Sequence, residues 1–193
     1  MKPAAAIVMA LLIGITHAQS PAPAPAPIPA PAPTEKAMTL TSTAFETNTA
    51  LPVAFTADGD GTSPPLAWAD APKGTVSYAI MMDDPQARGF VHWIIWGIPS
   101  TESTLSAKMP RDLEVKSPAG ARQGVTSWGR ERPGYWGSAP GKGSGVHHYT
   151  FTLYALDSKL ELAAGASPKE FKKAIEGHVL AKTMLVGLYE RPD

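Results

Sequence analysis

Apolar and polar residues alternate along several segments of this chain with a period of two, which is typical of β-strands. The clearest case is residues 147–156, HHYTFTLYAL, in which aromatic and aliphatic side chains occupy every second position. Residues 77–83 and 90–98 are apolar and rich in aromatic and β-branched side chains, which is also a strand signal. Weaker strand patterns cover residues 38–45, 52–56, 123–128 and 184–189.

One α-helix is predicted close to the C-terminus. Ser167 is followed three positions later by Glu170, the spacing of a capping box, and Pro168 occupies the first helical position. The spacing of one helical face then continues through Phe171, Ala174, Ile175 and His178. The pattern predicts a mostly β domain with a late helix, and it predicts His178 as a core residue on that helix.

The N-terminus has the organisation of a secretory signal. A single lysine precedes an apolar run over residues 4–15, and Thr16-His17-Ala18 then places small residues where a signal peptidase reads them. We expect a signal peptide over residues 1–18 and a periplasmic or secreted protein. An uncleaved membrane anchor is the weaker alternative, because the apolar run is shorter than a spanning helix requires.

Composition separates a linker from the domain that follows it. Residues 19–37 are dominated by alternating Pro and Ala, which predicts an extended polyproline-II linker, and residues 38–193 remain as one domain. The formal net charge is zero and no stripe of Lys or Arg occurs, so we expect no nucleic-acid partner. The chain has no cysteine, which excludes disulfides and thiolate sites. We expect no transmembrane segment in the mature protein.

Ionisable groups stand at the ends of the apolar strands. Asp84 directly follows one strand, His92 lies in the next, and His147 and Tyr149 begin a third. Each falls on a face expected to point into the core, where an ionisable group must be paired, hydrogen-bonded or neutralised. We therefore expect the four groups to meet around one polar cavity. The Gly-rich residues 135–145 offer backbone N–H groups that can approach an anion closely.

Four segments resemble, in order, the motifs of the phosphatidylethanolamine-binding protein family, in its bacterial branch often labelled Raf kinase inhibitor-like. They are DGDGTSPPLAW at residues 58–68, DPQAR at 84–88, FVHWIIWGIP at 90–99 and GVHHY at 145–149. The predicted helix and the closing LVGLYER at residues 185–191 also fit. Each motif alone is modest, but four in the family's order are highly specific.

This resemblance implies a central β-sheet with a second, smaller sheet and a late helix. It also implies a pocket for a small anionic ligand, phosphate-like or carboxylate, such as phosphate or phosphoethanolamine. The residues that match the family's ligand-binding positions are Asp84, Phe90, His92, Ala139, Pro140, His147 and Tyr149. We expect binding without catalysis, with no cofactor and no metal.

Four positions depart from the family's motifs, and they concern the rim of the pocket. Gln86 replaces the second acid and Arg88 the closing proline of the D-P-D-x-P motif. His148 replaces the arginine of the G-x-H-R-Y motif, and Gly141 stands where many members have a second proline. The sequence leaves the effect of these changes open, although Arg88 could bring a cation to the pocket mouth.

The residue types themselves agree with anion binding. Two histidines and a tyrosine hydroxyl can donate hydrogen bonds to a phosphate or a carboxylate. Asp84 is an acceptor when ionised, so it is expected to orient a histidine and favour its charged form, or to receive an ammonium group of the ligand. Binding is then expected to weaken as the pH rises through the histidine pKa values.

Two other functions stay open. The protein could be an inhibitor or regulator of an envelope hydrolase or another protein partner. A His/Asp-dependent hydrolase with Ser138 or Ser144 as nucleophile is disfavoured, because no G-x-S-x-G elbow is present. A metal site is disfavoured because no close-spaced ligand motif occurs.

Four of the five tryptophans divide into two groups. Trp136 lies in the Gly-rich segment, where it either covers the pocket or packs elsewhere. The tryptophans expected to be core aromatics are Trp93, Trp96 and Trp128.

Overall fold

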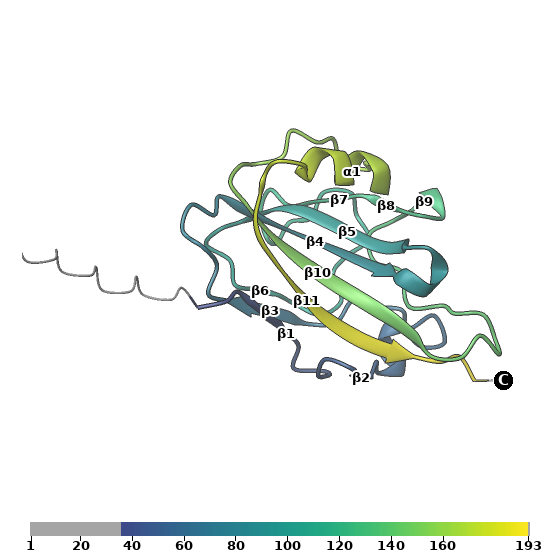
Figure 1. Cartoon of the computed structure of the whole chain (residues 1–193). Coiled ribbons are helices and arrows are strands. Elements are labelled where there is room, and N and C mark those ends of the chain that lie inside the picture. The colour runs from purple at the N-terminus through teal and green to yellow at the C-terminus, as the bar shows by residue number, and fades with distance from the viewer. Residues whose placement is uncertain (1–35, 193) are drawn as a thin grey trace, which may run out of the picture. The chain divides into compact units, whose positions relative to one another are not determined.

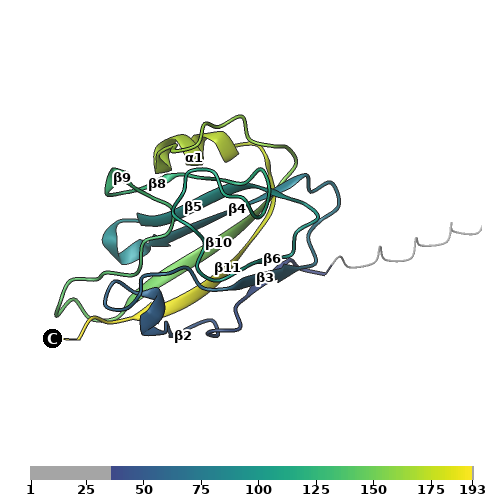
Figure 2. The same ribbon diagram turned by 180° about the vertical axis from the view of Figure 1, so that it is seen from behind.

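The computed structural model describes residues 36–192, so the predicted signal peptide and most of the predicted linker lie outside the described residues. Two β-sheets enclose a buried core, and the helix α1 covers the opposite face of the larger sheet (Figures 1 and 2). This is the mostly β architecture, with a smaller second sheet and a late helix, that the sequence predicted.

The larger sheet contains the strands that carry the candidate site. Its strand order is β2-β11-β10-β4-β5-β7, and every neighbouring pair is antiparallel except β2 with β11. The strands are β2 (Thr49–Ala50), β4 (Ser77–Asp84), β5 (Phe90–Pro99), β7 (Arg122–Gln123), β10 (His147–Leu156) and β11 (Val179–Tyr189). The three strongest strand predictions are confirmed, and β10 has the predicted bounds.

The smaller strands form a second sheet and a short hairpin. The second sheet consists of β1 (Thr39–Thr41), β3 (Leu66–Ala69) and β6 (Thr104–Leu105), and β8 (Val125–Thr126) pairs with β9 (Gly129–Pro133).

Two of the weaker strand predictions need correction. The strand predicted at 52–56 is instead the 3-10 helix η1 (Val53–Phe55), in which the Phe55 N–H donates to the Pro52 carbonyl. The strand predicted at 123–128 is divided between β7 and β8 at Gly124. A Cβ at Gly124 would lie 2.6 Å from the Ala166 carbonyl oxygen.

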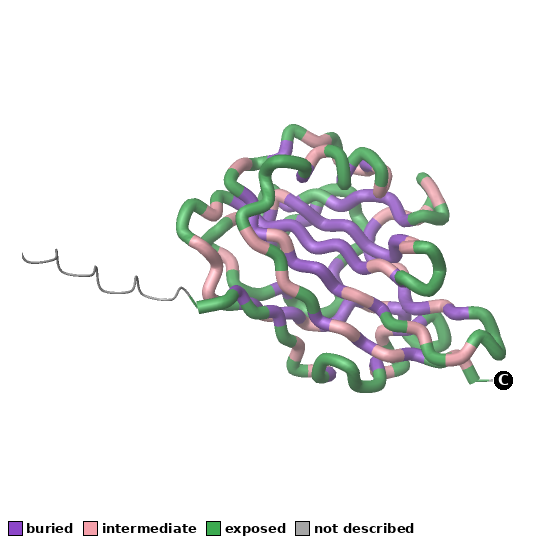
Figure 3. The backbone as a smooth tube through the Cα atoms, in the orientation of Figure 1, coloured by how far each residue is buried: buried purple, intermediate pink, exposed green. Residues whose placement is uncertain are grey.

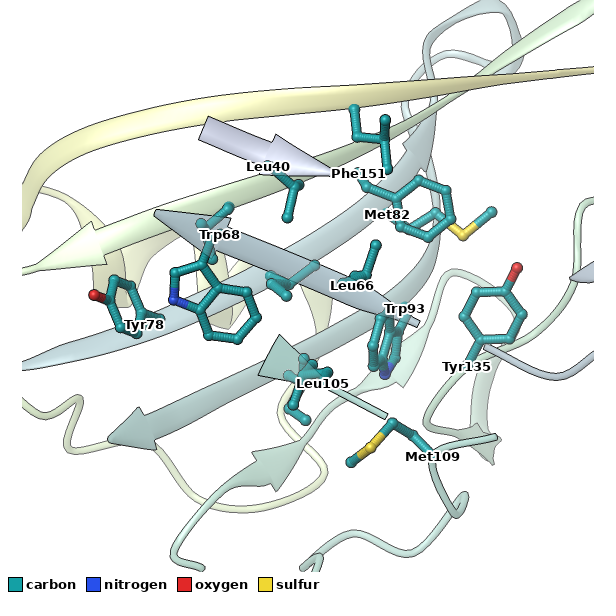
Figure 4. Close-up of a cluster of buried hydrophobic side chains, with 14 of the residues drawn as sticks. Leu40, Leu66, Trp68, Tyr78, Met82, Trp93, Leu105, Met109, Tyr135 and Phe151 are labelled. Atoms are coloured by element: carbon teal, nitrogen blue, oxygen red, sulfur yellow. The ribbon is translucent and has the colours of Figure 1, made fainter. Parts of the chain in front are cut away.

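The main core lies between the two sheets. Trp93 and Phe151 from the larger sheet pack with Leu66 and Trp68 from the smaller one (Figure 4). The central strands β4, β5 and β10 are buried along most of their length, and most exposed residues lie outside them (Figure 3). Burial of large side chains on both inner faces is what holds a two-layer β structure together.

A second apolar cluster fixes α1 (Pro168–Ile175) to the larger sheet. Phe171 is buried against Trp96 and Tyr154, and the Ser167–Glu170 capping box is present as predicted. The prediction for His178 is wrong, because the helix ends before it and the side chain is exposed. Its Nδ1 lies 2.9 Å from Asp157 Oδ1 at the surface. Because the ring is exposed, the protein avoids the cost of burying a polar group.

The Gly-rich segment between β9 and β10 is anchored to the loop that precedes β3. Thr56 and Ser138 form an isolated β-bridge, and the Ala57 N–H donates to the Ser138 carbonyl at 2.9 Å. Gly137 lies so close to this loop that a Cβ would be 2.4 Å from the Thr56 carbonyl carbon. Only glycine fits this contact without displacement of the backbone.

We expect Gly137→Ala to destabilise the protein by roughly 1–3 kcal/mol, because the methyl group would force the two backbones apart. Urea unfolding measures this directly. Gly141→Ala is a matched control in the same segment, since its Cβ would meet nothing closer than 4.0 Å. Equal stability of the two variants would contradict the close packing of Gly137.

Candidate functional site

The site is organised around a hydrogen bond between two neighbouring strands of the larger sheet. Asp84 is the last residue of β4 and His147 the first of β10. Because these neighbouring strands are antiparallel, both residues lie at the same end of the strand pair. Asp84 Oδ2 lies 2.6 Å from His147 Nδ1. Asp84 Oδ1 accepts from the Ala87 N–H at 3.1 Å. The carboxylate is 3% exposed and the imidazole 13%, so the pair is nearly removed from water.

A β-bulge brings His92 to this pair. In the pairing of β4 with β5, Met82 lies opposite Trp93 and Asp83 lies opposite Val91, so His92 is the extra residue. Plain alternation would place His92 on the face of Ile94, beneath α1. The bulge instead turns the His92 ring toward the site, where its centre lies 5.3 Å from the centre of the Tyr149 ring. Bulges of this kind are common beside active sites, where they redirect a side chain.

His92 is held as a neutral imidazole. Its side chain is buried, and Nδ1 lies 3.2 Å from the Trp136 carbonyl oxygen, so Nδ1 must be the donor. Burial lowers the pKa of His92 to about 4, although the hydrogen bond to Trp136 and the charge of Asp84 act in the opposite direction. The remaining Nε2 is then an acceptor. The expectation that both histidines donate to an anion is therefore not supported for His92.

Tyr149 lies at the centre of the cluster. Its ring stacks on His147 at 6.4 Å and contacts His92 edge-on. The hydroxyl is buried and has no hydrogen-bond partner among the described residues. Burial raises its pKa and the Asp84 charge adds to that shift, while the Ala139 backbone opposes it. Tyr149 is therefore protonated at neutral pH, and its hydroxyl lies close to the Asp84 side chain and the Ala139 backbone without a hydrogen bond of normal geometry to either.

The remaining predicted site residues lie on two sides of this cluster. Phe90 is half-buried at the start of β5, and its ring contacts the His92 ring at 5.3 Å. Ala139 and Pro140 belong to the segment between β9 and β10. The Ala139 backbone approaches the Tyr149 hydroxyl, and the Pro140 carbonyl oxygen lies 3.5 Å from Arg191 Nη1.

The sequence reading missed one aromatic residue of the site. Trp128 was expected to be a core residue, whereas it is 40% exposed at the turn between β8 and β9. Its ring contacts Phe90 at 4.6 Å and His92 at 5.0 Å. The neighbouring Gly129, which favours a turn, was the available signal that this tryptophan stands outside a strand. Trp93 and Trp96 are buried as expected.

Two of the departures from the family's motifs contact each other. The Gln86 side-chain amide is hydrogen-bonded to His148 Nδ1, and the His148 N–H donates to Gln86 Oε1 at 3.1 Å. This neutral pair fastens the 3-10 helix η2 (Pro85–Ala87), which begins at Asp84, to β10. His148 is exposed, whereas Tyr149, the next residue of the strand, is buried. Arg88 is also exposed, with a left-handed backbone (φ 58°) at the end of η2.

An ion pair between distant segments supports the rim. Arg191 Nη2 lies 2.7 Å from Asp58 Oδ1, and Arg191 Nε lies 2.9 Å from both carboxylate oxygens. The Tyr189 hydroxyl donates to Asp58 Oδ2 at 2.6 Å. These bonds lower the pKa of Asp58. Because Arg191 also reaches the Pro140 carbonyl, the segment that follows β11 helps to hold the rim in position.

Most of the cluster is removed from solvent. Asp84, His92 and Tyr149 are buried, whereas His147 and Phe90 are half-buried and Trp128 is exposed. Within residues 36–192, no group of three or more His, Cys, Asp or Glu side chains is arranged to hold a metal ion. No helix in the same part of the chain has the length and apolar character needed to cross a membrane.

The depressed pKa of His92 makes a testable contribution to stability. The unfolded chain binds a proton near the ordinary imidazole pKa of about 6.5, whereas the folded protein does so only near about 4. Stability should therefore fall as the pH is lowered through this window, by roughly 3 kcal/mol in total. We expect His92→Gln to remove this part of the pH dependence, measured as urea unfolding at both ends of the window.

The control for this experiment is His178→Gln, at an exposed histidine of the same protein. Its pair with Asp157 is solvent-exposed, so the change in pH dependence should stay below about 1 kcal/mol. A pH profile of His92→Gln that matches the unsubstituted protein would show that His92 is not held neutral by burial.

Comparison with known proteins identifies the family. A family model described as phosphatidylethanolamine-binding protein matches residues 41–190. A UPF0098 protein of Pyrococcus horikoshii is 43% identical over 152 residues, which are 78% of this chain and 75% of that protein. A Mycobacterium tuberculosis protein named as a lipoprotein, LppC, is 37% identical over 154 residues, covering 78% of this chain and 71% of its own.

A solved structure agrees with this assignment. The crystal structure of Escherichia coli YbcL, described as a member of the mammalian PEBP family, superposes with a TM-score of 0.75 at 30% identity. The superposition covers 81% of this chain and 99% of YbcL. The family resemblance expected from the four motifs is thus confirmed, and this chain belongs to the phosphatidylethanolamine-binding protein family.

Proposed function

We propose that this protein binds a small anionic group, phosphate-like or carboxylate, at Asp84, His92, His147 and Tyr149, without catalysis. The observation that carries the proposal is the buried Tyr149 hydroxyl, which has no hydrogen-bond partner within residues 36–192. A buried donor left unpaired costs roughly 1–3 kcal/mol. An anionic oxygen between Tyr149 and His147 would recover that free energy.

His147 supplies the second donor in this proposal. Its Nδ1 is held by Asp84, which leaves Nε2 as the ring nitrogen available to a ligand. An anion can accept from Nε2 only when both ring nitrogens carry protons. The negative charge of Asp84 on the far side of the ring compensates that positive charge. Binding to a neutral His147 therefore takes up one proton.

His92 gives the site an acceptor beside these donors. Its Nδ1 donates to the Trp136 carbonyl oxygen, so the free Nε2 can accept from a ligand hydroxyl or ammonium group. Tyr149 and His147 thus face anionic oxygens, while His92 faces a hydrogen atom of the ligand. This combination favours hydrogen phosphate or a phosphoethanolamine-like group over a plain carboxylate.

The surroundings of the Asp84–His147 pair favour binding over catalysis. A nucleophilic serine would need its hydroxyl hydrogen-bonded to the imidazole. The Ser144 hydroxyl instead donates to the Gly141 carbonyl at 2.6 Å, and the buried Ser138 hydroxyl has no partner among the described residues. The pair therefore lacks an activated nucleophile.

The cellular location belongs to the same proposal. A signal peptide over residues 1–18, a Pro/Ala-rich linker over residues 19–37 and the lipoprotein name of the M. tuberculosis relative favour a periplasmic or secreted protein. An exported binding domain could also act on a protein partner in the envelope. Its pocket would then receive an acidic side chain of that partner.

The two donors, Tyr149 and His147, are tested by an NMR titration with sulfate. Sulfate has no hydrogen atom to offer His92, but it keeps its charge from about pH 5 to about pH 8, the range in which imidazole titrates. We expect the affinity to fall as the pH rises, because binding to His147 requires its second proton. His147→Gln should weaken binding by about tenfold to a hundredfold, the loss of one hydrogen bond to a charged group. It should also flatten the pH dependence.

His178→Gln is the matched control, because His178 lies beyond the opposite end of β10 from His147. It should leave sulfate affinity and its pH dependence unchanged. Affinity that is the same in all three proteins would place binding elsewhere. Turnover of phosphate esters that disappears in Ser138→Ala or Ser144→Ala would contradict the non-catalytic part of the proposal.

A further inference from the structure

The guanidinium group of Arg132 lies over two tryptophan rings beside the site. Arg132 is in β9, and its Cζ atom is 4.9 Å from the ring centre of Trp128 and 4.7 Å from that of Trp136. The β9 strand lies beside the loop that joins β4 to β5 in both views (Figures 1 and 2). Two indole rings thus position a planar cation through cation–π contact.

The hydrogen-bonding capacity of Arg132 is unused. Within residues 36–192, no carboxylate lies within 4.0 Å of its guanidinium nitrogens and no acceptor is hydrogen-bonded to them. Arg111 differs, although it also stacks on Trp136, because it donates to the carbonyl oxygens of Gly61 and Tyr135. Stacking occupies the faces of a guanidinium and leaves its in-plane N–H groups free for a bidentate anion.

Arg132 is separated from His92 of the candidate site by one tryptophan ring. Trp128 is 5.0 Å from the His92 ring and 4.9 Å from the Arg132 guanidinium carbon. The centre of the His92 ring and the Arg132 guanidinium carbon therefore lie at most about 10 Å apart, which is the sum of their two distances to the Trp128 ring. Phe90 and the exposed Trp128 form the apolar surface in this region.

We propose that Arg132 is a second anion-binding point, and that the ligand carries two anionic groups joined by a short apolar spacer. This inference rests on the proposed function, in which the first anionic group binds at His147 and Tyr149. The spacer lies against Phe90 and Trp128, and the second group accepts from the free edge of the guanidinium. Two linked contacts bind more tightly than either alone when the spacer matches their separation.

The test compares methylphosphonate with alkane bisphosphonates of increasing chain length, by isothermal titration calorimetry on the unsubstituted protein. One bisphosphonate should bind about tenfold or more tightly than methylphosphonate, since a hydrogen-bonded charge pair contributes about 1.5 kcal/mol or more. Arg132→Gln should remove this gain and leave methylphosphonate affinity unchanged. Arg132→Lys should retain part of it, because lysine keeps the charge but lacks the planar fork.

Arg130→Gln is the matched control, in the same strand and with the same change of charge. It should preserve the preference for the bisphosphonate. If methylphosphonate binds and no bisphosphonate binds more tightly, Arg132 only stacks on the tryptophans and the inference is wrong. If Arg130→Gln and Arg132→Gln reduce the gain equally, the effect is general electrostatics and the inference also fails. If methylphosphonate does not bind at all, the proposed function fails, and this inference with it.

Discussion

The carboxylate of Asp84 is almost completely removed from water, and its two hydrogen bonds compensate for that loss. One bond holds the 3-10 helix η2 through the Ala87 N–H, and the other holds the His147 ring. An unpaired buried carboxylate would cost several kcal/mol, so each partner is under strong constraint. The turn after β4, the start of β10 and the orientation of the His147 ring all depend on this one side chain.

The rim is held by contacts between segments far apart in the sequence. Arg191 connects Asp58 to the Pro140 carbonyl, and the Thr56–Ser138 bridge fixes the same segment from the other side. The Tyr149 hydroxyl is buried without a hydrogen-bond partner in the part of the chain that the structure describes, and such a group in a protein interior calls for an explanation. A rim fastened at both ends can keep a donor ready for a ligand instead of collapsing onto it.

The departures from the family's motifs have different consequences. Gln86 and His148 bond to each other, so the two changes preserve the connection between η2 and β10 without a charged pair. Arg88 remains exposed, and no ion pair ties it to the rest of residues 36–192. The guanidinium group of Arg132 lies over the Trp128 ring beside the site, which neither strand patterns nor the family motifs had indicated.

Local patterns were sufficient for the framework of this protein. Alternation along β10, the capping box at Ser167 and the four ordered motifs predicted the strands, the helix and the family, because these features depend on neighbouring residues. The patterns failed where spacing along the chain no longer gives the direction of a side chain. His178 kept the helical spacing but lies beyond the helix end.

Which residues make up the site was decided only by the tertiary structure. His92 reaches Tyr149 only because the register of β4 against β5 leaves it as the extra residue of a bulge. Its neutral state follows from burial beneath the Trp136 carbonyl, a contact between residues 44 positions apart. Trp128 reaches His92 from the turn of the β8–β9 hairpin. Register, burial and long-range contacts result from the summed packing of the whole domain, which no single stretch of sequence contains.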